Sequence, residues 1–207
     1  MNNNTERRFF PLEDTEVRIA KEEGKPTKIV GYFAKFNKLS ENLGGFREKI
    51  DRGFFSEALK TSDTVDPFNH DSNYVMGRIS AGTLKVWEDE TGLRYECTPP
   101  DTQLIRDLVL TPIERGDIKG CSFGFRIKGN GDMWEEDSEG RVVRTLLKDG
   151  CKELLDGSQV VFPAYPDTDV AMRSKDNWKK NEQEEELRSR HYQVGIKKRQ
   201  LDIKNRG

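Results

Sequence analysis

Apolar positions concentrate between about residues 16 and 172, where they form short runs with alternating polarity. Two β-rich runs, at 16–20 and 28–36, flank a polar turn, and a second pair of runs predicts a hairpin over 83–98. Further strands are expected at 46–50, 74–79, 118–129 and 158–162, with a hairpin turned at 137–140. Many short strands joined by hairpin turns favour an α+β or barrel-like β domain over a βαβ alternation.

A helical pattern stands out at residues 101–115. Asp101 and Thr102 can cap its start, Pro112 should kink or shorten it, and Gly116 can end it. Its apolar positions share one helical face: Leu104, Ile105, Leu108, Val109 and Ile113. The pattern predicts one helix among the strands.

Charge divides the chain into parts. Residues 173–207 contain 11 Lys and Arg against 6 Asp and Glu, whereas residues 1–172 contain 24 against 31. The net charge of −2 therefore combines an acidic body with a basic tail. We expect a flexible N-terminus over 1–15, a folded domain over 16–172 and a charged basic C-terminal tail over 173–207. The tail is either a solvated, disordered extension or a segment that binds acidic surfaces.

Several classes of protein are excluded by composition. No run approaches the roughly 20 apolar residues that span a bilayer, and the N-terminus lacks the apolar region of a secretory signal. The cysteines, Cys97, Cys121 and Cys151, form no CxxC pair, so we expect neither a zinc site nor a disulfide framework. We predict a soluble protein of a reducing cytoplasm, without metal or cofactor.

Ser122 is the candidate nucleophile because of the residues around it. In the strand expected at 118–129 it shares a face with Gly120 and Gly124. Two glycines weaken a strand, so they indicate that another backbone or a substrate chain approaches closely; a bend at a barrel corner is the alternative. Cys121 falls on the opposite, core-facing side with Phe123, which favours a buried structural thiol over a second nucleophile.

A serine nucleophile needs a base, and the chain has only two histidines. His191 lies in the charged tail, where a solvated position is expected, which leaves His70 as the base. A carboxylate usually orients such a histidine. The candidates are Asp71, Asp132, Glu153 and Asp156, and the residues alone do not choose among them.

The segment 120–124 also matches G-x-S-x-G, the nucleophile elbow of α/β-hydrolases. An elbow requires a helix after the serine, but here the strand pattern continues through residue 129. The chain order of that triad would also require His191 as the base. We therefore interpret the match as fortuitous.

Six segments in order and spacing carry a resemblance to a known family. They are GYFAKFNKLSENLGGFREKIDRGFF, FNHD, GR, GTLKVWEDETGLRYECTPPDT, IERGDIKGCSFGFRI and VVFPAYPDTDVAMR. Over residues 17–173 the chain resembles the prohead maturation proteases of tailed phages, serine peptidases related in fold to the herpesvirus assemblins. The resemblance implies a closed antiparallel β-barrel flanked by a few helices over 16–172.

Site residues follow from the same resemblance. The family's histidine falls on His70, its serine on Ser122 and its acidic residue on Asp156, an aspartate where glutamate is more usual. Glu153 is the reserve candidate for the acid. The resemblance implies acyl transfer in which Ser122 attacks a peptide carbonyl and His70 accepts its proton.

The implied biology is that of a serine endopeptidase inside the immature capsid, in the host or prophage-carrying cytoplasm. It would cut scaffold, or the scaffolding segment of the major capsid protein, and then often itself. No cofactor, membrane or specific nucleic acid is implied, and a homo-oligomer is compatible with the resemblance. The competing hypothesis is a non-enzymatic scaffolding protein that binds capsid subunits.

Overall fold

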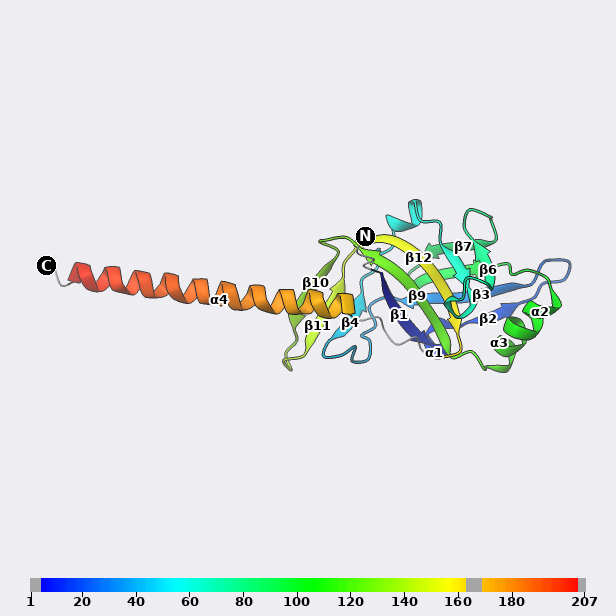
Figure 1. Ribbon diagram of the computed structural model, residues 1–207, viewed down its shortest axis with the longest axis horizontal. Helices are drawn as coiled ribbons and strands as arrows, with labels where there is room; N and C mark the ends of the chain where they lie inside the picture. The colour runs from blue at the N-terminus through cyan, green and yellow to red at the C-terminus, as the bar shows by residue number, and fades with distance from the viewer. Residues whose placement is uncertain (1–4, 163–168, 205–207) are drawn as a thin grey trace. The chain divides into compact units, whose positions relative to one another are not determined.

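The structure, a computed structural model, describes residues 5–162 and 169–204 (Figure 1). The chain forms two compact units, residues 1–170 and residues 171–207. The first unit holds every strand of the described residues, and the second is built on the long C-terminal helix α4 (Asp169–Lys204).

A five-stranded sheet forms the centre of the first unit. Its order is β1 (Glu6–Pro11), β9 (Gly120–Ile127), β12 (Cys151–Val160), β5 (Val65–Pro67) and β6 (Val75–Arg78). The pairs are antiparallel except β12 with β5, which is parallel. The long strands β9 and β12 cross the domain side by side (Figure 1). Residues 6–11, which the sequence placed in a flexible N-terminus, form the edge strand of this sheet.

Two further sheets complete the unit. One has the order β2 (Arg18–Ala20), β3 (Lys28–Lys35), β8 (Gly92–Cys97) and β7 (Leu84–Glu88). The other has the order β10 (Asp132–Glu136), β11 (Val142–Leu146) and β4 (Arg47–Ile50), with β11 and β4 parallel. The hairpins expected at 83–98 and around 137–140 are confirmed as β7–β8 and β10–β11.

The predicted closed antiparallel barrel is wrong. The described residues form a mixed α+β fold of three open sheets, and two strand pairs are parallel. Alternation along a strand shows which side chains face the core but not which strand pairs with which. Here β1 and β6 end the central sheet as edges, so the sheet does not close.

The predicted helix is confirmed over residues 103–115. It comprises α2 (Gln103–Ile105), a π-helical stretch (Arg106–Leu110) and α3 (Thr111–Arg115). Thr102 caps it, since its side chain accepts a hydrogen bond from Ile105 N at 3.3 Å. Gly116 ends it with a φ of 79°, a conformation that favours glycine.

Aromatic side chains from the sheets fill the core. Phe33 of β3 stacks on Tyr95 of β8 with ring centroids 3.9 Å apart, and Phe123 of β9 packs edge-on against Phe55. Cys97, Cys121 and Cys151 are buried and unpaired. Burial raises the pKa of Cys121 to about 12, so this thiol is inert at neutral pH, in agreement with its interpretation as structural.

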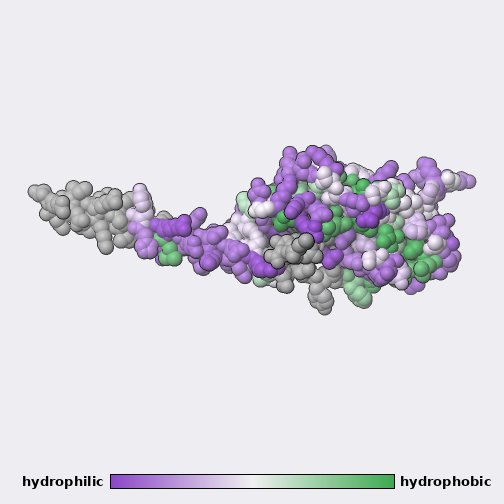
Figure 2. Space-filling view, turned by 45° about the horizontal axis from the view of Figure 1, so that its top comes forward, coloured by the Kyte–Doolittle hydropathy of each residue, from purple (hydrophilic) through white to green (hydrophobic). Residues whose placement is uncertain are grey.

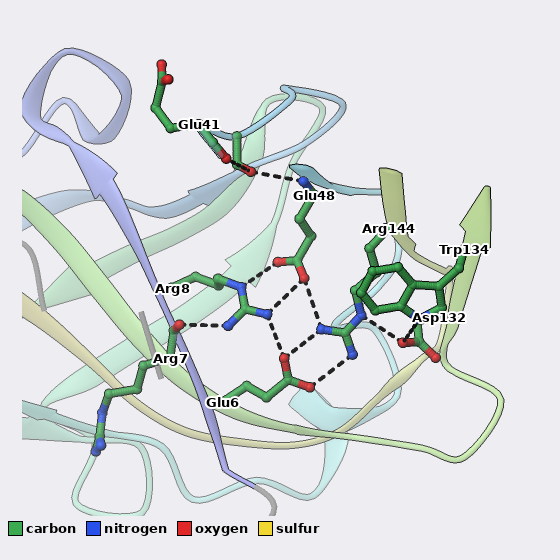
Figure 3. A network of polar contacts seen from close by, with 9 residues as sticks. Glu6, Arg7, Arg8, Glu41, Glu48, Asp132, Trp134 and Arg144 are labelled. Atoms are coloured by element: carbon green, nitrogen blue, oxygen red, sulfur yellow. Dashed lines mark hydrogen bonds and ion pairs between the residues drawn. The ribbon is translucent and has the colours of Figure 1, made fainter. Parts of the chain in front are cut away.

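Four buried charged residues and the half-buried Asp132 join β1 to the three-stranded sheet, and we call the five the ion network (Figure 3). They are Glu6 and Arg8 of β1, Glu48 of β4, Asp132 of β10 and Arg144 of β11. The Arg8 guanidinium donates to Glu48 at 2.6 Å, and Arg144 donates to Glu6 at 2.6 Å and to Asp132 at 2.7 Å. The network fastens the N-terminal strand to a second sheet.

The second unit is a polar helix. Figure 2 shows the described side chains of α4 as almost entirely hydrophilic, and Glu186 pairs with Arg190 one turn further along at 2.8 Å. The described side chains of α4 form no apolar stripe, so the pattern of apolar residues does little to indicate a helix in this segment. None of the described helices is both long and apolar enough to span a membrane.

Candidate active site

The central strand β9 places Ser122 between two neighbouring strands. Ser122 lies opposite Phe9 of β1 and opposite Ser158 of β12. Directly opposed residues of antiparallel strands point to the same face, with Cβ atoms about 4.5–5.5 Å apart. The serine side chain is fully buried, and its Oγ has no hydrogen-bond partner. Ser122 and Ser158 therefore lie side by side on one face of the sheet.

The two glycines that flank Ser122 make room for parts of the protein itself. A Cβ on Gly120 would lie 2.0 Å from the carbonyl oxygen of Phe10 in β1, which is the close backbone approach that the sequence indicated. A Cβ on Gly124 would lie 2.9 Å from Oδ2 of Asp156. The second glycine is needed for a carboxylate on the face that carries Ser122.

His70 ends a short 3₁₀ turn, η2 (Phe68–His70), that packs against β12. Asn69 and His70 both adopt left-handed backbone conformations, with φ of 53° and 58°. Such conformations are uncommon outside glycine, although Asn and His tolerate them better than most residues. The Asn69 side chain fixes the turn, because its Oδ1 accepts a hydrogen bond from Val161 N at 2.9 Å. Strain of this kind is characteristic of functional turns.

The His70 ring faces two side chains of β12 with the same nitrogen. Nδ1 lies 2.9 Å from Oδ1 of Asp156 and 3.1 Å from Oγ of Ser158. The Asp156 contact is at ion-pair distance, although Oδ1 accepts no well-aligned hydrogen bond. The other ring nitrogen, Nε2, is buried without a hydrogen-bond partner, as is Oγ of Ser122. We call His70, Ser122, Asp156 and Ser158 the site cluster.

Asp156 reaches His70 because β12 is irregular there. The register of β12 against β9 shifts between Leu154 and Asp156, a bulge that re-aims the following side chains. On the far side of the carboxylate, Arg7 of β1 donates to Oδ2 at 3.2 Å. Burial alone would raise the pKa of Asp156, but His70 and Arg7 outweigh burial and hold this pKa below its usual range. The carboxylate is ionised between two groups that can carry positive charge.

The other acidic candidates have partners elsewhere. Asp71 accepts hydrogen bonds from the backbone and side chain of Asn73, Asp132 belongs to the ion network, and Glu153 accepts from Arg126 at 2.5 Å. His191 lies on α4, where Nδ1 is 2.8 Å from the carbonyl oxygen of Leu187. Among the described residues, only Asp156 of the four candidates is within ion-pair distance of His70.

Two residues of the site were missed from the sequence. Ser158 follows Asp156 by two positions in β12, so the two-residue period of a strand could have placed both side chains on one face. Arg7 lay in a segment expected to be flexible, and only the pairing of β1 with β9 brings it to Asp156.

A second polar group was also missed, on the core side of β12. Gln159 donates to Oδ2 of Asp66 at 3.2 Å and to the hydroxyl of Tyr95 at 3.1 Å. Burial raises the pKa of Asp66 to about 7. The Asp66 side chain points to the core face of the sheet, whereas Ser158 points to the other face.

The model of the caudovirus prohead serine protease family matches residues 13–183. The chain belongs to this family. The resemblance seen in the sequence is thereby confirmed, and β9, η2 and β12 all lie within the matched part of the chain. The strand β1 lies outside it. Neither the curated proteins nor the solved structures include a significant match. Membership in this family indicates a capsid maturation protease.

Proposed function

We propose that the chain is a serine endopeptidase that cleaves scaffold, or the scaffolding segment of the capsid protein, during prohead maturation, with Ser122 as nucleophile, His70 as base and Asp156 as the orienting acid. One observation carries the proposal. In a member of a serine protease family, the hydroxyl of Ser122 and Nε2 of His70 are both buried without partners in one cluster. Buried polar atoms are nearly always hydrogen-bonded, so two unpartnered atoms in one cluster favour a reactive pair.

The contacts of Nδ1 suit His70 for the role of base. With its proton on Nδ1, the ring donates toward Asp156 and Ser158, and Nε2 is left as the acceptor. Nε2 takes the hydroxyl proton as Oγ of Ser122 bonds to the peptide carbonyl carbon. The imidazolium then gives that proton to the departing amine as the C–N bond breaks, and water releases the acyl group by the reverse proton path. The ionised Asp156 stabilises the imidazolium during both steps.

Access to the nucleophile requires a local movement. Ser122 is fully buried, and its Oγ is not hydrogen-bonded to His70. A substrate carbonyl reaches Oγ only after covering side chains shift, and catalytic hydrogen bonds commonly tighten when substrate binds. We therefore expect the pair to align in the complex with the substrate.

A fluorophosphonate probe tests the nucleophile without knowledge of the substrate. Oγ of Ser122 bonds to phosphorus, fluoride leaves, and His70 takes the proton, so the adduct should map to Ser122 by mass spectrometry. Ser122→Ala should abolish labelling and should also abolish processing of the co-expressed capsid protein of the same phage. Ser138→Ala, at an exposed hairpin position, is the matched control and should behave as wild type.

Two results would overturn the proposal. One is capsid-protein processing that continues undiminished in Ser122→Ala. The other is a chain that supports capsid assembly equally well with and without Ser122 but loses this ability when residues 173–207 are deleted. That second result would identify a scaffolding protein instead of a protease.

A further inference from the structure

The N-terminal strand supplies an active-site side chain from outside the part of the chain that defines the family. The family match begins at residue 13, whereas β1 ends at Pro11. The register of β1 against β9 places Arg7 opposite Gly124, the glycine that leaves space for the Asp156 carboxylate. Arg7 thus lies on the face of the sheet that carries Ser122.

We propose that Arg7 is a positioning residue, which holds the Asp156 carboxylate against His70 and sets the charge that the imidazole meets. Its guanidinium donates to Oδ2 at 3.2 Å, while Oδ1 lies 2.9 Å from Nδ1 of His70. Each carboxylate oxygen is engaged from a different side, so rotation of the carboxylate is restricted. The catalytic part of this inference rests on the proposed function, but the contact and its electrostatic effect do not.

The opposite face of β1 explains why Arg7 stays in place. Glu6 and Arg8, its neighbours in the strand, belong to the ion network and are 0% and 4% exposed. Figure 3 shows the Arg7 side chain pointing away from that network. Because successive side chains of a strand alternate between faces, an anchor at Glu6 and Arg8 presents Arg7 to the site. The strand thereby couples the ion network to the site cluster.

The charges around His70 determine in which direction the loss of Arg7 should change its protonation. Asp156 of β12 faces Nδ1, Arg7 of β1 faces the other side of that carboxylate, and Asp66 of β5 interacts electrostatically with Asp156 from beneath the sheet. Asp71, next in sequence, is turned toward Asn73. A positive Arg7 disfavours the imidazolium, so its removal should let His70 protonate at higher pH.

Histidine NMR measures this effect directly. The chain has two histidines, so the ring signals of His70 and His191 can be assigned with a His191→Gln variant. In Arg7→Gln the titration midpoint of the His70 signal should rise by about 0.5–1 pH unit, as expected for a partly exposed charge near the surface. The His191 signal should not move. Arg7→Lys keeps the charge and should leave the His70 midpoint close to wild type.

Labelling kinetics measure the consequence for reactivity. For Arg7→Gln we expect a fluorophosphonate rate at high pH about tenfold below wild type, because a misplaced orienting group lowers reactivity at Ser122. The acid limb of its pH profile should move to higher pH. Arg18→Gln, at an exposed arginine of β2, the next strand along the chain, is the matched control and should match wild type in both respects.

The outcomes separate this inference from the proposed function. An unmoved His70 midpoint in Arg7→Gln overturns the electrostatic role, whatever the activity. A lower labelling rate that follows a loss of folded protein, with an unmoved acid limb, reduces Arg7 to a structural residue and also overturns the inference. If wild type is not labelled at Ser122 while the His70 midpoint still moves, the proposed function fails and the Arg7 contact stands.

Discussion

The two faces of β1 contribute to two buried polar groups with opposite character. On one face, Glu6 and Arg8 enter the ion network, whose described charged side chains all have hydrogen-bond partners (Figure 3). On the other face, Arg7 reaches the site cluster, where Ser122 Oγ and His70 Nε2 have none. A single strand therefore connects a fully satisfied network with an unsatisfied one.

The two groups differ in how burial is compensated. Burial alone would raise the pKa of Glu6, but Arg144 and Arg8 hold this pKa below its usual range, so the carboxylate stays charged. In the site cluster the unpartnered atoms cost stability, on the order of 1–3 kcal/mol for each buried group. The ion network fixes the strand that borders this costly cluster.

The largest effect is expected from breaking the network at Arg144. Arg144→Met would remove the cation shared by Glu6, Glu48 and Asp132, and would leave Arg8 as the one arginine of the network beside the two buried glutamates. Loss of one partner from a buried ion pair typically costs about 3–5 kcal/mol of unfolding free energy. Urea denaturation followed by circular dichroism would measure it.

Arg141→Met is the matched control for this change. Arg141 pairs with Asp137 at 2.8 Å in an exposed hairpin turn, where an ion pair contributes about 0–1 kcal/mol. Equal losses in the two variants would show that the ion network does not anchor β1. Labelling of Ser122 should also fall in Arg144→Met, since Arg7 is held by the same strand.

A carboxyl group without a cationic partner provides the next test. Asp66 has the neutral Gln159 as its hydrogen-bond donor, and burial raises the pKa of Asp66 to about 7. Between pH 4 and 7 the folded chain keeps a proton that the unfolded chain loses, so stability falls as pH rises across this window. The total loss should reach up to about 4 kcal/mol.

Asp66→Asn removes that titration. The variant should exceed wild type in unfolding free energy at pH 8, and the excess should shrink toward pH 4.5. Asp156 acts in the opposite sense because its pKa is lowered in the folded chain. The stability that its ionised form contributes is lost only as the pH falls below the usual pKa of an aspartate. Parallel pH profiles for wild type and Asp66→Asn would contradict the assignment to Asp66.

A smaller effect distinguishes the two glycines beside Ser122. In Gly120→Ala the new Cβ meets the backbone of β1, which cannot move away without breaking its pairing with β9. We therefore expect the unfolding free energy to fall by about 1–3 kcal/mol. In Gly124→Ala the Cβ meets the Asp156 carboxylate, a side-chain group that can shift only by giving up contacts with Arg7 and His70. The unfolding free energy of that variant should fall by less. Its rate of fluorophosphonate labelling should fall about tenfold, because the displaced carboxylate no longer orients His70.

Both glycine variants need denaturation and labelling measured together. A Gly124→Ala chain that is labelled as fast as wild type would show that the position of Asp156 does not matter. A Gly120→Ala chain as stable as wild type would show that β1 is not closely packed on β9.

Local patterns predicted the elements of this fold but not their assembly. The helix at 103–115 and the two hairpins follow from apolar period, caps and turn residues, which are local properties. The barrel was wrong because closure depends on pairing between distant strands, such as β12 with β5. The strand β1 was missed because it begins with three consecutive charged residues, which look solvent-exposed until buried partners from β4 and β11 are present.

The residues of the candidate site could be chosen from the sequence only in part, for similar reasons. Scarcity pointed to His70, and glycine neighbours pointed to Ser122, before any geometry was known. Asp156 came from the family resemblance, since the bulge in β12 that aims it has no clear signal in sequence. Arg7 could not be predicted, because its contact with Asp156 depends on a register set by residues more than a hundred positions away.

The smallest effect is expected at Glu153, the reserve candidate for the acid. Its carboxylate is 41% exposed and pairs with Arg126, on the strand of Ser122 but away from His70. Glu153→Gln should keep the labelling rate within about twofold of wild type and lower the unfolding free energy by at most about 1 kcal/mol, as for other exposed pairs.

Asp156→Asn should instead lower the labelling rate by up to about 10⁴-fold, as when a triad acid is neutralised. If the two results were exchanged, Glu153 would be the orienting acid. The Arg7 contact would then lie outside the reactive centre, and β1 would serve the network alone.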